Sequence, residues 1–282
     1  MVAQIQRLLV TGASGMLGSW VARLALESGW SVAGTYRTRP LPLPIDWHQL
    51  DLTDRAAAPA LIAGLAPVAV IHTAFMQTDP DMWSITADGA ATVALGAAGV
   101  GARLVHLSSD ALFDGIDGVY AESAPPSPIT PYGAAKAAAE TAVATIAPRA
   151  AIVRTSLILC RDPLDRHSRA ALDLVAGRAQ GCLFTDEYRC PIAVEDLAAA
   201  TLELATHAYA GVINVAGSDA VSRHELGCLV AASHGMPCDA VPATTLAASG
   251  LRRPANVRLD STLARGLLRT RLRGAREYLG AA

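Results

Sequence analysis

The sequence contains few cysteines, and their spacing is irregular. There are five in 282 residues, at positions 160, 182, 190, 228 and 238, and no two form a Cys-x-x-Cys pair. An odd count without such a pair argues against a disulfide framework and a zinc site. We therefore expect reduced thiols, a cytoplasmic location and no bound metal.

Long apolar runs and an excess of one charge are also missing. Hydrophobic residues make up 52% of the chain, but no run of about 18 apolar residues lacks a charge or a helix breaker, so we expect no membrane span. The N-terminus lacks the pattern of a signal peptide. The formal net charge of −2 gives no electrostatic footprint for nucleic acid or an anionic membrane.

Lysine is almost absent, since Lys136 is the only one and every other basic residue is arginine. The many alanines and arginines are typical of a coding bias. Against that background, the position of the single lysine is informative.

Short apolar runs alternate with alanine-rich segments of helical spacing. This alternation predicts a doubly wound parallel α/β sheet of the Rossmann type with a smaller C-terminal substrate-binding lobe. We expect the Rossmann part to span residues 1–156 and about 190–216, and the lobe about 157–189 and 217–282. The predicted strands are Arg7–Thr11, Ser31–Thr35, Val68–His72, Arg103–Ser108, Ala151–Thr155 and Val212–Val215. The predicted helices are Leu17–Ser28, Trp83–Gly99, Tyr132–Ile146, Ser168–Gly177, Glu195–Thr206 and Arg223–His234.

A glycine-rich turn follows the first predicted strand and opens the first helix. Its glycines, Gly12, Gly15 and Gly18, have the spacing Gly-x-x-Gly-x-x-Gly. Such glycines allow a tight turn, close approach of a pyrophosphate and close helix–strand packing, and the helix N-terminus attracts phosphate. We assign Ser14, Met16 and Leu17 to the same cofactor site.

The end of the second predicted strand carries arginines and no carboxylate. An acidic residue there would favour NAD, whereas arginine suits the 2′-phosphate of NADP. Arg37 and Arg39 therefore predict NADP(H) in preference to NAD(H), unless both are solvated loop residues. Neighbouring cofactor contacts are expected from Tyr36, Asp51 and Leu52.

Tyr132 and Lys136 are four residues apart at the start of a predicted helix, so they lie on one face. A tyrosine pKa of about 10 is too high for efficient proton transfer near neutral pH, and a nearby ammonium lowers it. Ser108 and Ser109 end a predicted strand, where a hydroxyl can hold a substrate carbonyl oxygen. Either serine could instead be a turn residue.

These motifs resemble the extended short-chain dehydrogenases/reductases, and among them the dTDP-4-dehydrorhamnose reductase family. The resemblance spans nearly the whole chain: Thr11–Gly18, Gln49–Asp54, Leu107–Gly115, Pro131–Glu140, Val153–Ser156, Val221–Leu226 and Arg253–Asp260. It implies that Ser109, rather than Ser108, is catalytic together with Tyr132 and Lys136. It also implies cofactor contacts from Thr73, Ala74 and Thr155.

Substrate contacts are expected from Ser109, Phe113, Asp186 and Arg253. Phe113 fits a substrate pocket or a core equally well, and Arg253 suits a substrate pyrophosphate or a solvated basic face. The sequence departs from the family pattern at Thr86, where such reductases carry asparagine, and at Glu187 and Ile192, where glutamine and threonine are usual. His72 likewise replaces an asparagine.

The leading functional hypothesis is an NADPH-dependent reductase of a small-molecule ketone, with the 4-keto group of a nucleotide-linked 6-deoxysugar as the favoured substrate. An epimerase, or a reductase of another ketone, remains an alternative within the same superfamily. A different class of function is also open: a non-catalytic NADP-binding regulatory subunit, like the methionine adenosyltransferase accessory subunit that shares this pattern. A homodimer is compatible with the sequence.

Overall fold

The computed structural model describes residues 6–280, which form two compact units. The first unit consists of residues 6–109, 131–153 and 198–213, and the second of residues 110–130, 154–197 and 214–280. Four segments that the sequence assigns to the Rossmann part lie in the second unit: residues 154–156, 190–197, 214–216 and 110–130. The longest contains residues 110–130. They belong to the second unit because strand β6 (Gly118–Tyr120) pairs with the distant strand β15 (Val257–Leu259).

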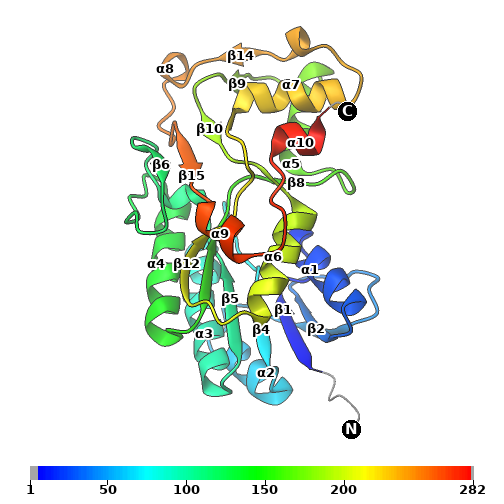
Figure 1. Ribbon diagram of the computed structural model, residues 1–282, viewed down its shortest axis with the longest axis vertical. Helices are drawn as coiled ribbons and strands as arrows, with labels where there is room; N and C mark the ends of the chain where they lie inside the picture. The colour runs from blue at the N-terminus through cyan, green and yellow to red at the C-terminus, as the bar shows by residue number, and fades with distance from the viewer. Residues whose placement is uncertain (1–5, 281–282) are drawn as a thin grey trace. The chain divides into compact units, whose positions relative to one another are not determined.

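A parallel sheet lies at the centre of the first unit (Figure 1) and confirms the predicted α/β class. It has seven strands. Its order is β12-β7-β5-β4-β1-β2-β3. The strands are β1 (Arg7–Thr11), β2 (Ser31–Tyr36), β3 (Asp46–Gln49), β4 (Ala69–His72), β5 (Arg103–Leu107), β7 (Ala151–Arg154) and β12 (Gly211–Asn214). The chain proceeds outward from β1 in one direction and from β4 in the other. Ligands bind at such a reversal, outside the carboxyl ends of the strands.

The helices of this unit are α1 (Met16–Glu27), α2 (Ala57–Leu65), α3 (Gly89–Gly99), α4 (Pro131–Ile146) and most of α6 (Val194–Thr206). Helices α2, α3 and α4 pack in sequence against one another. With the sheet they enclose a core that includes Leu9, Val70, Val93, Val143 and Ile152. Right-handed crossovers place α1 on the other face of the sheet. Helix α2 was missing from the prediction.

The second unit is built from short elements. Its helices are α5 (Arg166–Val175), α7 (Arg223–Ser233), α8 (Leu246–Ser249), α9 (Thr262–Leu267) and α10 (Ala275–Leu279). Besides β6 and β15, its paired strands are β8 (Ile158–Leu159) with β11 (Ile192–Ala193), β9 (Leu183–Phe184) with β14 (Ala243–Thr244), and β10 (Tyr188–Arg189) with β13 (Val221–Ser222). A core that includes Leu159, Leu172, Leu226, Val230 and Tyr278 joins β8, α5, α7 and α10.

The expectation of reduced thiols throughout is wrong for one pair of cysteines. Cys228 on α7 and Cys238 form a disulfide, ten residues apart in sequence. Gly235, with φ of +70°, reverses the chain after α7, so Cys238 returns beside the helix. Cys160, Cys182 and Cys190 are not disulfide-bonded. The Cys228–Cys238 disulfide was not predicted from the sequence because its two cysteines are brought together by a helix and a turn, not by a Cys-x-x-Cys spacing.

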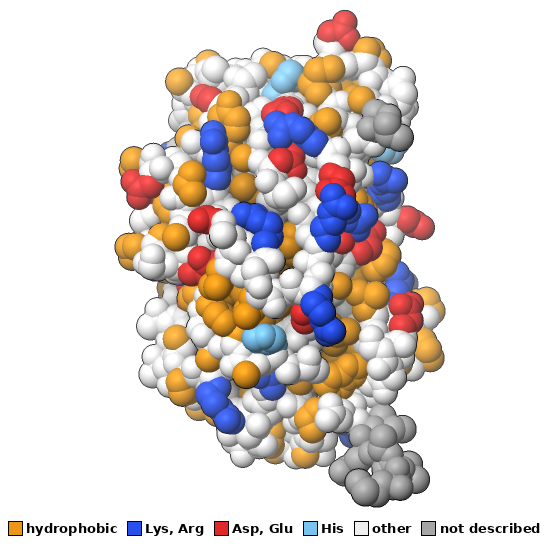
Figure 2. Space-filling model, viewed as in Figure 1, with side chains coloured by type: hydrophobic (Ala, Val, Ile, Leu, Met, Phe, Trp, Pro, Cys, Tyr) orange, Lys and Arg blue, Asp and Glu red, His pale blue; other side chains and the backbone are white. Residues whose placement is uncertain are grey.

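Within residues 6–280, no helix has the length and apolar character that crossing a membrane requires. On the face drawn in Figure 2, arginines and acidic side chains are intermixed. That arrangement matches the near-balanced formal charge of the chain.

Candidate cofactor and active site

The glycine-rich turn adopts a geometry that side chains would block. Gly12 has φ of +74°, a region that favours glycine, and a Cβ atom there would lie 2.9 Å from the Ala74 backbone. A Cβ atom on Gly18 would lie 2.2 Å from the Gly12 carbonyl oxygen. The Gly15 amide donates to that same oxygen at 2.9 Å. The turn therefore packs tightly between β1, α1 and the segment after β4.

A cleft of about 210 Å³ opens at this turn within the first unit. Eight of the predicted cofactor residues line it: Gly12, Ser14, Gly15, Tyr36, Arg37, Leu52, Thr73 and Ala74. The prediction missed five further lining residues: Thr35, Leu50, Phe75, Met76 and Ile85. The cleft lies at the carboxyl ends of β1, β2 and β4, beside the N-terminus of α1. Glycine backbone, a helix N-terminus and apolar walls fit a dinucleotide.

Arg37 sits at the end of β2 with 41% of its side chain exposed, and it forms an ion pair with Asp81 at 3.2 Å. The Gln49 side-chain amide donates to the Arg37 carbonyl oxygen, which fixes the backbone there. Arg39 is exposed. Asp51 is also exposed, and the Thr53 amide and hydroxyl, donating hydrogen bonds to its carboxylate, lower its pKa. Asp51 therefore acts locally as a turn residue.

The first turn of α4 presents the tyrosine and the lysine together. The Tyr132 side chain is half-buried, whereas Lys136 is only 3% exposed. The Phe75 ring lies 5.9 Å from the Tyr132 ring, centroid to centroid, and the Lys136 Nζ lies 5.3 Å from the Phe75 ring centroid. Because Phe75 also lines the cleft, it connects the cleft to both residues.

The Lys136 ammonium donates a 2.8 Å hydrogen bond to the carbonyl oxygen of Leu107, the last residue of β5. Burial lowers the pKa of this lysine to about 8, while the charge of Glu140 opposes that shift. Ser108 and Ser109 follow Leu107 directly. Ser108 is buried, and Ser109 is half-buried. Ser109 is thus the more accessible of the two hydroxyls.

Two buried histidines lie side by side at the ends of β4 and β5. His72 and His106 are register partners, and their rings stack at 5.3 Å. The His72 Nδ1 lies 2.6 Å from the Thr11 hydroxyl oxygen. Burial first, and then the charge of Lys136, lowers the pKa of His72 to about 3 and that of His106 well below its usual value. Both rings are neutral at physiological pH and serve as packing elements.

Thr86, the departure from the family asparagine, lies in a π-helix of residues Ser84–Asp88 that leads into α3. Its hydroxyl donates to the Met76 carbonyl oxygen at 2.8 Å and accepts from the Met76 amide at 2.9 Å. The threonine therefore fixes the backbone of a residue that lines the cleft.

In the second unit, an ion-pair cluster occupies the segment that departs from the family pattern. The Glu187 carboxylate is 2% exposed and lies 3.0 Å from the Arg253 guanidinium and 3.4 Å from that of Arg189. Asp110 lies 3.6 Å from Arg189. Glutamate in place of glutamine thus supplies a counter-charge for a buried arginine. Arg253, predicted to contact substrate, is held by Glu187.

The second unit also holds three further residues predicted to bind ligands, Asp186, Phe113 and Thr155. The Asp186 carboxylate accepts a hydrogen bond from the Leu246 amide. Phe113 is fully buried, stacked on Tyr120 at 4.1 Å between ring centroids, and therefore belongs to the core rather than to a substrate surface. Thr155 is 6% exposed, and its hydroxyl has no hydrogen-bond partner among the described residues.

The parallel sheet, the glycine-rich turn at its topological reversal and the tyrosine–lysine pair define an extended short-chain dehydrogenase/reductase. Comparison with known proteins supports this class. The family described as "RmlD substrate binding domain" matches residues 6–282. The chain belongs to this family, which places it among the NAD(P)-dependent oxidoreductases.

Individual relatives differ in their named roles. The chain is 29% identical to the methionine adenosyltransferase 2 subunit beta of Xenopus tropicalis, covering 90% of this chain and 80% of that protein. It is 33% identical to the probable low-salt glycan biosynthesis reductase of Haloferax volcanii, covering 77% of each. The structure of dTDP-4-dehydrorhamnose reductase from Bacillus anthracis, in complex with NADP, superposes with a TM-score of 0.84 at 23% identity, covering 99% of this chain and 98% of that one.

Proposed function

We propose that this protein is an NADPH-dependent reductase that reduces a ketone on a small molecule, with the 4-keto group of a nucleotide-linked 6-deoxysugar as the substrate. The observation that carries the proposal is the placement of Tyr132 and Lys136 on the first turn of α4, connected through Phe75 to the cleft at the glycine-rich turn. A half-buried phenol beside a buried ammonium is the arrangement needed to deliver a proton.

Each residue has a distinct role in this proposal. Bound NADPH supplies the hydride. Tyr132 donates its phenolic proton to the carbonyl oxygen as that oxygen gains negative charge. Lys136 stabilises the resulting phenolate by its positive charge. Ser109 donates a hydrogen bond to the same carbonyl oxygen and orients it.

The proposed choice of NADPH over NADH rests on Arg37. Its guanidinium is partly exposed at the rim of the cleft, and a 2′-phosphate would offer it a dianionic partner in place of Asp81. No carboxylate follows β2 within residues 37–45, where a ribose 2′-hydroxyl would need one.

The cofactor assignment is tested by tryptophan fluorescence titration of the wild type, Arg37→Ala and a control, Arg55→Ala, with NADPH and NADH. Arg55 is an exposed arginine of the same unit that pairs with Asp88 and does not line the cleft. We expect Arg37→Ala alone to weaken NADPH binding by about tenfold or more, with NADH unaffected. Equal weakening of both cofactors, or none, would contradict the Arg37 assignment.

The reductase assignment is tested by NADPH oxidation with a nucleotide-linked 4-keto-6-deoxyhexose. Tyr132→Phe keeps the ring that packs on Phe75 but removes the proton donor. We expect it to bind NADPH as the wild type does and to lose at least about a hundredfold in kcat. A variant that retains full activity would exclude Tyr132 as the proton donor.

A second candidate function is supported by the similarity to the methionine adenosyltransferase subunit. On this alternative, the chain binds a dinucleotide in the same cleft but acts on a partner protein. Two measurements distinguish these functions. A regulatory subunit binds NADPH tightly but does not oxidise it with any keto-sugar nucleotide. In addition, Tyr132→Phe leaves its effect on the partner protein unchanged.

A further inference from the structure

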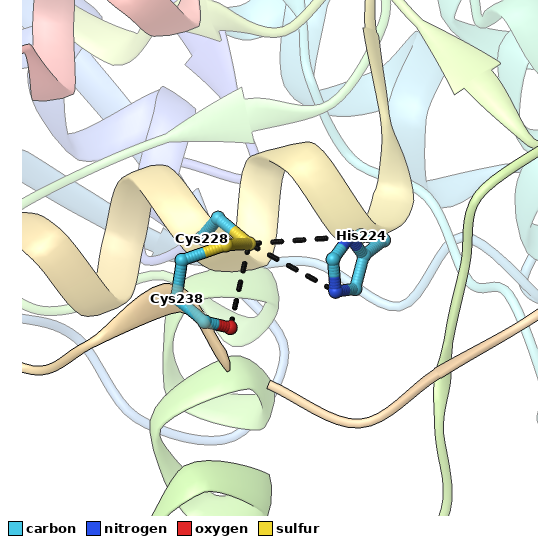
Figure 3. A group of neighbouring side chains, drawn as sticks. All are labelled: His224, Cys228 and Cys238. Atoms are coloured by element: carbon cyan, nitrogen blue, oxygen red, sulfur yellow. Dashed lines mark hydrogen bonds between the residues drawn. A yellow bond between two sulfur atoms is a disulfide. The ribbon is translucent and has the colours of Figure 1, made fainter. Parts of the chain in front are cut away.

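A cluster of histidine and cysteine side chains lies in the second unit, apart from the residues assigned to the reductase. His224 and Cys228 are four residues apart on α7 and therefore share one face of the helix. Gly235 reverses the chain, and Cys238 returns to that face at the start of a short 3-10 turn, Cys238–Ala240. Figure 3 shows the three side chains converging, with one potential ligand atom of each within 4.8 Å of the others.

The His224 ring lies between the Val241 carbonyl oxygen and the Cys228 sulfur. Its Nε2 lies 3.2 Å from the Val241 carbonyl oxygen. A carbonyl oxygen only accepts hydrogen bonds, so a hydrogen bond here requires the proton on Nε2, which in the neutral ring leaves the Nδ1 lone pair available. Both ring nitrogens, Nδ1 and Nε2, lie 3.9 Å from the Cys228 Sγ (Figure 3). Metal-binding histidines commonly donate their second N–H to a backbone carbonyl in this way, which fixes the tautomer.

We propose that, when the Cys228–Cys238 disulfide is reduced, these two cysteines and His224 bind one Zn²⁺ ion. Reduction by a dithiol breaks the S–S bond: two electrons and two protons pass to the cysteines, and the dithiol closes to its own disulfide. Zinc binding then releases both thiol protons to solvent. Two thiolates balance the charge of the ion, neutral Nδ1 is the third ligand, and a water molecule is the fourth.

The ligand type favours zinc. Two thiolates and an imidazole form a set typical of Zn²⁺, whereas Mg²⁺ and Ca²⁺ require oxygen ligands. Tetrahedral bonds of about 2.3 Å to sulfur and about 2.0 Å to nitrogen separate the ligand atoms by about 3.5–3.8 Å. The distance of 3.9 Å between Cys228 Sγ and His224 Nδ1 is close to that requirement, and the two sulfurs, bonded to each other in the disulfide, would separate to it on reduction. Cys238 is exposed, so an ion can enter from solvent.

The site would control the segment that follows Cys238. Strand β14, which begins at Ala243, pairs with β9, and the Leu246 amide donates to Asp186. The disulfide and the zinc ion would each tie the start of this segment to α7. Reduced, metal-free protein would lack both connections. The inference concerns residues outside the cofactor cleft and does not depend on the reductase assignment.

Metal binding is measured on the full-length chain after reduction with a phosphine and removal of metal with a chelator. Co²⁺ is the spectroscopic probe, and Zn²⁺ affinity is measured in competition with a chromogenic chelator. We expect one Co²⁺ per chain with sulfur-to-cobalt charge-transfer absorption, its loss on adding one equivalent of Zn²⁺, and no binding by the disulfide form. Two protons should be released per zinc bound.

Variants assign the ligands. Cys228→Ser and Cys238→Ser should each lower the charge-transfer absorption and weaken zinc binding by at least about tenfold, whereas Cys182→Ser, at another exposed cysteine, should bind like the wild type. His224→Gln keeps both sulfurs and decides the matter if a cysteine variant fails to fold. The proposal is overturned if the reduced wild type binds zinc no more tightly than Cys228→Ser, or if His224→Gln leaves the affinity unchanged.

Discussion

The Lys136 ammonium donates a hydrogen bond to the carbonyl oxygen of Leu107 at 2.8 Å. This bond links the first turn of α4 to the end of β5, and Ser109 lies two residues beyond Leu107. The lysine therefore helps to fix the strand that carries the proposed substrate hydroxyl, besides standing one helical turn from Tyr132. Its burial has a measurable consequence for stability.

We predict that stability depends on pH through Lys136. Burial lowers its pKa in the folded protein from 10.5 to about 8. Between about pH 8 and about pH 10.5 the unfolded chain binds the Lys136 proton more readily than the native state does. The free energy of unfolding therefore increases as the pH rises through this window, and this increase is lost below about pH 8. Thermal unfolding of the cofactor-free wild type and Lys136→Met should show the wild type gaining Tm relative to the variant over that window. Parallel Tm curves would show that the lysine is solvated.

A methyl group at Gly18 should disrupt the cofactor turn. Its Cβ atom would lie 2.2 Å from the Gly12 carbonyl oxygen, so Gly18→Ala must displace the turn. We expect a lower Tm and NADPH binding weakened by more than about tenfold. Gly64 on α2 is the matched control, because a Cβ atom there meets nothing within 4 Å. Gly64→Ala should be neutral or stabilising by up to about 1 kcal/mol. Similar losses in both variants would rule out a specific role for the turn.

Removing the competing partner of Arg37 should strengthen NADPH binding. Asp81 pairs with Arg37 at 3.2 Å, and both side chains are largely exposed. Exposed ion pairs contribute about 1 kcal/mol or less, so Asp81→Asn should lower the Kd for NADPH by about two- to fivefold. The affinity for NADH should stay constant. Fluorescence titration checks both, and a weaker NADPH complex would show that Asp81 supports the site.

Neutralising Glu187 should destabilise the protein. Its buried carboxylate lies against Arg189 and Arg253, and Arg189 is itself buried. Removing one partner of a buried pair leaves an uncompensated charge, which costs about 3 kcal/mol. Chemical denaturation of Glu187→Gln should show this loss. Glu277→Gln, which breaks the more exposed pair with Arg271, should change stability by less than about 0.5 kcal/mol. Equal effects would indicate that Asp110 alone balances Arg189.

Elements with strong local signals were predictable. The strand Arg7–Thr11 has a continuous apolar centre, Leu8–Val10, because the parallel sheet buries both faces, and the structure places β1 over that same range. Tyr132 and Lys136 share a helix face by their spacing alone. Helix α2 escaped prediction because its run of alanines and leucines carries little polar contrast. The residues around Phe113 in the sequence do not distinguish a core residue from a ligand contact. Only its complete burial in the structure shows that it is a core residue.

By itself, the sequence determined the parallel α/β fold, the glycine-rich turn and the tyrosine–lysine pair, because each depends on residues close together in the chain. The tertiary structure alone decided which distant residues meet. Phe75 reaches Tyr132, Glu187 meets Arg253, and Cys238 returns to Cys228 and His224. The physical reason is that such contacts depend on how turns and packed elements direct the backbone, and residue spacing along the chain does not record that direction.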